Sequence, residues 1–242
     1  MANNKSCTSN TCIVFDFDCT LTNEHLYYLL HDTDNFIKMY NIRDKTEIYD
    51  MANTIKSIYS VDNTKIDCDI ILPKSITKKF IDTIFGGSSR IKILDKFLKK
   101  CIKQNIDLYI SSRGYLRDII TSLKITNLLK YFKSIHSTLD KTIYQIDNQI
   151  KTIDYNSGKE FFILNILNHY TNVLYIDDTL TEHERLKNIF VLKNSGTGYE
   201  LYSTLIDNVT KYYAFINTLT KNGSGIATTE IDIIKMLINK LV

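Results

Sequence analysis

Two carboxylates close a short apolar run near the start of the chain. The run Cys12–Phe15 is followed by Asp16, Phe17 and Asp18, so the two aspartates lie two residues apart. On a continuing strand, this spacing puts both side chains on one face. Paired carboxylates serve as a nucleophile with a general acid–base, or hold a hard metal ion such as Mg²⁺. A DxD pattern alone also fits a turn, or the metal–nucleotide site of a sugar transferase.

Further polar residues follow apolar segments later in the chain or open a helix. In chain order they are Ser111, Ser112, Arg113, Lys159, Asp177 and Asp178. A hydroxyl, a cation and an acidic pair are groups that bind phosphate or a metal ion. Each also has a simple structural interpretation: Ser111 as a helix cap, Lys159 as a solvated lysine, and the acidic pair as an N-cap and turn.

Apolar periodicity predicts strands and helices in alternation around these residues. The predicted strands are Cys12–Phe15, Ile106–Ile110, Ile135–Leu139, Val173–Ile176 and Ile189–Leu192. The predicted helices are Ile91–Cys101, Tyr115–Tyr131, Lys159–His169 and Ile231–Leu241. This alternation is typical of an α/β fold, a mostly parallel sheet covered by helices on both faces. Ligands bind such sheets beyond the carboxyl ends of the strands, so the polar groups are expected to converge on that edge.

Two segments do not follow the alternation. Residues 23–89 form an insert after the first strand, with helical patterning at Phe36–Tyr40 and Ile48–Tyr59. The segment Lys141–Tyr155 alternates apolar and polar residues around Asp147 and Asn148, which predicts a small hairpin.

As an ordered set, the polar residues resemble the four motifs of the haloacid dehalogenase (HAD) superfamily of phosphohydrolases. The resemblance covers roughly residues 11–22 and 91–195. The first motif, DxDx[TV], is matched by Asp16, Asp18 and Thr20, and the second, a serine that closes a strand, by Ser111. The third motif, a lysine, is matched by Lys159, and the fourth, an acidic pair, by Asp177 and Asp178. It implies a Rossmann-like HAD core over residues 1–22 and 90–242, with a small helical cap, residues 23–89, in the first cap position of the superfamily.

The resemblance also implies the chemistry. Asp16 is expected to be the nucleophile that forms an aspartyl-phosphate, and Asp18 the general acid and base. Mg²⁺ is the expected cofactor, held by Asp16, by Asp18 through its backbone carbonyl, and by the acidic pair Asp177 and Asp178.

The same pattern implies where the substrate phosphate binds. Ser111 is expected to donate a hydrogen bond to it and Lys159 to supply a positive charge. Ser112 and Arg113 are expected at the rim of this site, where Arg113 either contacts the phosphate or lies at the start of the following helix.

Three alternatives remain open beside a phosphomonoester hydrolase. A phosphomutase or other phosphotransferase would use the same motifs. A protein or nucleic-acid phosphatase would also carry an acidic pair. A non-catalytic HAD-fold binding module would retain the fold alone. The insert of residues 23–89 favours a phosphorylated small molecule as substrate, because caps in this position accompany small soluble substrates in the superfamily.

Composition restricts the setting. The chain has 242 residues and a formal net charge of +3, too weak to indicate a nucleic-acid partner. No run is long and apolar enough for a membrane span. The five cysteines are odd in number and form no CxxC pair, which favours a reducing, cytoplasmic setting. The five histidines are scattered, and most are expected to be exposed or half-buried. The sequence leaves a monomer and a homo-oligomer both open.

Overall fold

The computed structural model describes much of the chain between residues 11 and 205. The described residues are 11–59, 72–145, 150–152, 158–167, 169–170, 172–179, 181–182, 184–186 and 200–205. The predicted strand Ile189–Leu192 and the predicted helix Ile231–Leu241 lie outside them.

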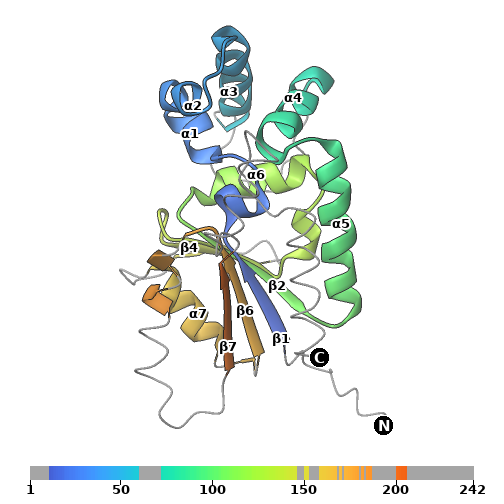
Figure 1. Ribbon diagram of the computed structural model, residues 1–242, viewed down its shortest axis with the longest axis vertical. Helices are drawn as coiled ribbons and strands as arrows, with labels where there is room; N and C mark the ends of the chain where they lie inside the picture. The colour runs from blue at the N-terminus through green and yellow to red at the C-terminus, as the bar shows by residue number, and fades with distance from the viewer. Residues whose placement is uncertain are drawn as a thin grey trace.

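Within these residues, a sheet in the order β5-β4-β3-β2-β1-β6-β7 forms the centre of the molecule (Figure 1). Its strands are β1 (Thr11–Phe15), β2 (Asp107–Ser112), β3 (Ser134–Ser137), β4 (Thr142–Gln145), β5 (Ile150–Thr152), β6 (Asn172–Asp177) and β7 (Glu200–Leu205). The pairs among β3, β2, β1, β6 and β7 are parallel, and β4 and β5 add an antiparallel hairpin at one edge. The α/β fold with a mostly parallel sheet is therefore confirmed.

Helices cover both faces of the sheet, as the alternating side chains of β1 require. Ile13 and Phe15 join the core under α5 (Ser88–Lys103) and α6 (Leu116–Ile125). Cys12 and Val14 point the other way, into the smaller core under α7 (Lys159–Leu167). Because β1 is buried on both faces, it reads as a continuous apolar run rather than an alternating one.

Four helices lie together beyond one end of the sheet and are called here the helical insert (Figure 1). They are α1 (Leu26–His31), α2 (Thr33–Met39), α3 (Lys45–Tyr59) and α4 (Lys74–Phe85). Leu29, Phe36, Met51 and Phe80 are fully buried among them. The predicted helical segments Phe36–Tyr40 and Ile48–Tyr59 overlap α2 and α3, whereas α1 and α4 were not predicted.

The two crossings between the insert and the core are bonded together. The backbone N–H of Asn23 donates to the carbonyl of Ile84 at 2.6 Å. The Arg90 guanidinium, near the start of α5, donates to the carbonyls of Leu21 and Phe85 at 2.8 and 3.1 Å. One core side chain thus holds both connections to the insert.

Two predicted elements differ in the structure. The helix predicted over Tyr115–Tyr131 ends at Ile125, because Asn127 adopts a left-handed conformation with φ of 58°. Asparagine tolerates that region better than most residues and so ends a helix readily. A separate 3₁₀ turn, η2 (Leu129–Tyr131), follows. The strand β7 was not predicted at all.

The structure bears on two expectations from composition, one about membrane spans and one about the cysteines. No described helix is long and apolar enough to cross a bilayer. Cys12, Cys19 and Cys101, the cysteines whose side chains are described, are buried, and none of the three forms a disulfide. Burial raises the pKa of the Cys101 thiol to about 12, so this side chain stays protonated.

Candidate active site

The carboxyl ends of β1 and β6 bring two aspartates together. Asp16 directly follows β1, and its backbone N–H donates to the carbonyl of Ile176 at 2.8 Å. Asp177 is the next residue and the last of β6. Since β1 and β6 are parallel neighbours in register, Asp16 and Asp177 emerge side by side at the edge facing the helical insert.

Lys159, the first residue of α7, lies between these two carboxylates. Its Nζ donates to Asp16 Oδ1 at 2.5 Å and to Asp177 Oδ2 at 2.7 Å. The lysine is only 4% exposed. Burial opposes its charge, but the two carboxylates outweigh burial and raise the pKa of Lys159, so it stays charged.

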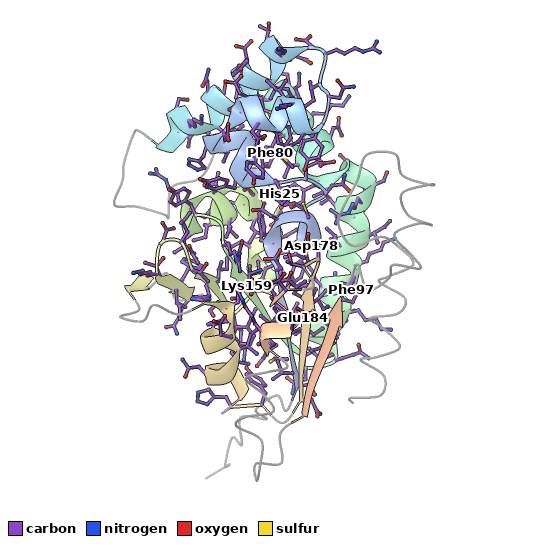
Figure 2. The ribbon with its side chains drawn as sticks, turned by 60° about the vertical axis from the view of Figure 1, so that its left-hand side comes forward. His25, Phe80, Phe97, Lys159, Asp178 and Glu184 are labelled. Carbon is purple, nitrogen blue, oxygen red and sulfur yellow. The ribbon has the colours of Figure 1, made fainter. Side chains whose placement is uncertain are left out.

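Asp178 completes a cluster of three carboxylates. Asp16, Asp177 and Asp178 each offer an oxygen, and these oxygens all lie within 4.8 Å of one another. Figure 2 shows Asp178 and Lys159 at the strand ends, below the helical insert. Asp16 and Asp177 are buried and Asp178 is half-buried. Together with Lys159 they are called here the carboxyl-end cluster.

The carboxylates of this cluster outnumber its one ammonium group, and their pKa values respond. Burial raises the pKa of Asp16, and the charges of Asp177 and Asp178 raise it further against the effect of Lys159. Burial and the charge of Asp177 raise the pKa of Asp178 to about 6. Burial also acts on Asp177, but Lys159, the Tyr175 hydroxyl and the Thr179 N–H hold its pKa below the usual range. A cation bound among these oxygens would relieve the repulsion.

Asp18 stands outside the three-carboxylate group. The chain after Asp16 forms a single wide turn, η1 (Phe17–Leu21), in which Cys19 is left-handed with φ of 58°. The Thr22 hydroxyl accepts from the Cys19 N–H at 3.0 Å and fixes this turn. Asp18 Oδ1 accepts from the Leu26 N–H at the start of α1, at 2.8 Å. Burial raises the pKa of Asp18 to about 7 in spite of this bond and of Lys159, a value suited to both giving and taking a proton.

Ser111, near the end of β2, is buried on the α7 side of the sheet. Its hydroxyl forms a hydrogen bond with His136 Nδ1 at 2.9 Å. The imidazole stacks on Phe162 of α7, with centroids 4.8 Å apart and planes inclined by 14°. Burial and the nearby charge of Lys159 lower the pKa of His136 to about 4, so the ring is neutral at pH 7.

Ser112 supports the loop that follows β2. Its hydroxyl accepts from the Gly114 N–H at 3.0 Å, and Ser137 of β3 donates to the Gly114 carbonyl at 2.8 Å. A Cβ at Gly114 would lie 3.6 Å from Asp18 Oδ2. The loop after β2 therefore passes close beside Asp18.

Arg113 projects from the same loop and pairs with Glu182. Glu182 is buried, and a second arginine, Arg185, reaches it at 3.3 Å. This pairing links the end of β2 to the segment after β6. Arg113 keeps a largely exposed side chain in this position.

The structure brings Asp16, Lys159, Asp177 and Asp178 into one cluster and carries Asp18 on the turn that follows Asp16. The other three predicted residues, Ser111, Ser112 and Arg113, lie on β2 and its loop, where they bond to His136, Gly114 and Glu182. Sequence reasoning missed His136 and Glu182. A buried position on the predicted third strand was the available signal for His136, but a single histidine there has no distinguishing pattern.

Comparison with known proteins gives similarities of structure only. No protein-family model and no curated protein sequence matches the chain. The HAD domain of effector protein Lem4 from Legionella pneumophila is 14% identical, with a TM-score of 0.38, over 88% of this chain and 94% of that one. A haloacid dehalogenase-like hydrolase from Streptococcus pneumoniae is 15% identical, with a TM-score of 0.42, over 95% and 99%. L-2-haloacid dehalogenase from Xanthobacter autotrophicus is 10% identical, with a TM-score of 0.41, over 93% and 87%.

Proposed function

We propose that this chain is a phosphomonoester hydrolase of the HAD superfamily, dependent on Mg²⁺ and acting through an aspartyl-phosphate on Asp16. The observation that carries the proposal is the carboxyl-end cluster. Three carboxylates converge at the strand ends around a single buried lysine, with a fourth, Asp18, on the adjoining turn. Burying this much negative charge is costly unless a bound cation offsets it. Such clusters are typical of functional sites.

The donor set of the cluster fits Mg²⁺. Asp16, Asp177 and Asp178 supply the hard carboxylate oxygens that this ion prefers, and they already lie within 4.8 Å of one another. These three residues would hold the metal, together with the backbone carbonyl of Asp18. When bound, Mg²⁺ would offset the negative charge shared by the carboxylates and the substrate phosphate.

The first half of the reaction uses both aspartates of the turn. An Asp16 carboxylate oxygen attacks phosphorus, and the bond from phosphorus to the ester oxygen breaks. Protonated Asp18 gives its proton to the departing oxygen, which leaves as the alcohol. A pKa of about 7 keeps a substantial fraction of Asp18 protonated at neutral pH.

The second half returns the enzyme to its starting state. Asp18, now ionised, takes a proton from water as the water attacks phosphorus. The phosphorus–oxygen bond to Asp16 breaks, and inorganic phosphate and the free carboxylate are released. Lys159, whose Nζ lies 2.5 Å from Asp16 Oδ1, is suited to hold a phosphate oxygen. Ser111 is assigned a hydrogen-bonding role toward the phosphate, and Ser112 and Arg113 the rim.

The helical insert is assigned to a cap over the site, with the core in residues 1–22 and 90–242. Its first helix begins at the Leu26 N–H bonded to Asp18, which supports a position directly above the reacting groups. A cover of this size favours a small phosphorylated molecule over a macromolecule, because it restricts access and excludes water.

Hydrolysis of 4-nitrophenyl phosphate tests the proposal. Turnover with Mg²⁺ should disappear with EDTA and in Asp16→Asn, while Asp107→Asn, at the far end of the sheet, should retain it. Adding an alcohol separates hydrolase from phosphotransferase, since only the latter passes phosphate to the alcohol instead of water. Turnover that survives in folded Asp16→Asn would contradict the proposed nucleophile.

A further inference from the structure

Three ring side chains gather where the helical insert meets the core. Tyr27 and His31 lie on α1, and Tyr115 immediately precedes α6. The ring centroids of Tyr115 are 4.6 Å from His31 and 6.1 Å from Tyr27, and Tyr27 and His31 are 5.3 Å apart. The Tyr27 and Tyr115 rings are nearly parallel, inclined by 25°. These residues are called here the aromatic cluster.

A buried carboxylate holds the aromatic cluster in place. His31 Nε2 and Asp118 Oδ2 are 2.6 Å apart, and Asp118 is buried in the first turn of α6. The bond joins the insert to the core and fixes the plane of the imidazole. Through this bond, His31 Nε2 and Asp118 Oδ2 are already engaged with each other.

The aromatic cluster remains open to solvent although it is firmly held. Tyr27 is 36% exposed, and the His31 side chain is 33% exposed. Tyr115 is half-buried. Rings that packed the insert onto the core and did nothing else would be expected to lie deeper, as Phe17 and Phe85 do.

Two residues of the aromatic cluster are the sequence neighbours of residues that lie against Asp18. Tyr27 directly follows Leu26, whose N–H donates to Asp18 Oδ1 at 2.8 Å. Tyr115 directly follows Gly114, where a Cβ would lie 3.6 Å from Asp18 Oδ2. At this distance a Cβ would be in van der Waals contact with the oxygen, so the backbone at Gly114 lies directly against Asp18.

From this juxtaposition we infer that the aromatic cluster binds the leaving group of the substrate, and that this group is planar and aromatic. The inference rests on the proposed function, in which Asp18 protonates the leaving oxygen and the leaving group must therefore lie beside it. Tyrosine and imidazole faces bind flat rings by stacking. A polyhydroxylated group needs free hydrogen-bonding partners, and here His31 and Asp118 are already bonded to each other.

Two esters with matched chemistry test the inference. 2-Phenylethyl phosphate and n-butyl phosphate both release a primary alkyl alcohol, so they differ mainly in the ring. With the full chain and Mg²⁺, kcat/KM should be about 10-fold higher for the phenylethyl ester, the size expected of a good stacking contact. Tyr115→Leu and Tyr27→Leu should each bring this ratio close to 1, and Tyr115→Phe should keep it.

A tyrosine beyond the end of α6 provides the control. Tyr131 lies on η2 and bonds to Asp95, away from Asp18. Tyr131→Leu should leave the ratio as in the wild type. A wild-type ratio near 1, or a high ratio that Tyr115→Leu and Tyr27→Leu both keep, would overturn the inference while leaving the hydrolase intact.

Binding separates failure of the inference from failure of the proposed function. The phosphonates 2-phenylethylphosphonate and n-butylphosphonate cannot be hydrolysed, and their affinities are measured by calorimetry with Mg²⁺ present. If neither ester is turned over, a preference for the phenyl compound that Tyr115→Leu removes would still support the aromatic site. Equal affinities in wild type and variant would overturn it.

Discussion

The polar groups at the two ends of the sheet differ in their balance of positive and negative charge. At the amino end, Asp107 opens β2, and its Oδ2 accepts from Tyr170 and from Lys133, each at 2.5 Å. Tyr109 bonds to Tyr170 at 2.6 Å. These residues are called here the amino-end cluster: one carboxylate, one lysine and two hydroxyls. At the other end, the carboxyl-end cluster sets three carboxylates against one lysine.

This difference separates a structural cluster from a candidate site. In the amino-end cluster, the charge of Asp107 is matched one for one, and Lys133 is 52% exposed, so water shares the cost. In the carboxyl-end cluster, the lysine is buried and is shared by Asp16 and Asp177, so three carboxylates face a single positive charge. An imbalance of this kind weakens the fold unless protonation or a bound cation offsets it. Excess buried charge, rather than buried charge itself, marks the site.

Neutralising one aspartate at each end should give the largest contrast, in activity. Asp16→Asn removes the proposed nucleophile and should lower kcat by at least about 10³-fold, as loss of a catalytic nucleophile does elsewhere. Asp107→Asn should leave kcat within about 3-fold in folded protein. Steady-state assays with Mg²⁺ measure both. Comparable losses in the two variants would remove the functional distinction between the ends.

Removing the lysine at each end should affect stability next most strongly. Without metal, Lys159→Met removes the cation that Asp16 and Asp177 share and should lower the free energy of unfolding by about 3–5 kcal/mol. Lys133→Met removes a half-exposed partner and should cost under about 1 kcal/mol. Urea denaturation in EDTA compares them. Equal costs would mean that burial of the lysine does not distinguish the two clusters.

Mg²⁺ should stabilise the protein through the carboxyl-end cluster alone. At a concentration 100 times the dissociation constant, a ligand of the native state adds about 2.7 kcal/mol to the free energy of unfolding. Asp178→Asn should reduce this gain, and Asp107→Asn should keep it. Thermal melts with Mg²⁺ and with EDTA give the values. A gain that Asp178→Asn retained in full would locate the metal elsewhere.

A smaller effect should follow from His136, beside the carboxyl-end cluster. Unfolded histidine takes up a proton near pH 6.5, but the pKa of His136 is lowered to about 4. The unfolded state therefore binds more protons between these values, and stability should fall as the pH drops from 8 to 5, by about 2 kcal/mol. His136→Gln should lose that part of the pH dependence in urea titrations. An NMR titration that placed the pKa of His136 near 6.5 would contradict this.

The elements predicted best from the sequence are those that leave an apolar pattern along the chain. The strands at Cys12–Phe15 and Val173–Ile176 appear as β1 and β6, because fully buried strands leave continuous apolar runs. The rule that ligands bind beyond the carboxyl ends of parallel strands placed Asp16 and Asp177 at one edge. Neither step required any knowledge of side-chain contacts.

Features that depend on partners distant in sequence could not be predicted. β7 is a strand because its backbone pairs with β6, and that pairing leaves no local pattern. The bond between His31 and Asp118 joins residues that are 87 positions apart. α6 ends early because Asn127 is left-handed, a conformation that asparagine tolerates but does not require.

Trapping the phosphorylated state of Asp16 tests the central claim most directly. Beryllium fluoride mimics a phosphoryl group on a carboxylate, and ¹⁹F NMR detects the bound adduct. With Mg²⁺, the wild type should show bound resonances that are absent with EDTA and absent in Asp16→Asn, while Asp107→Asn keeps them. Bound resonances that persist in folded Asp16→Asn would show that the carboxyl-end cluster does not carry the proposed chemistry on Asp16.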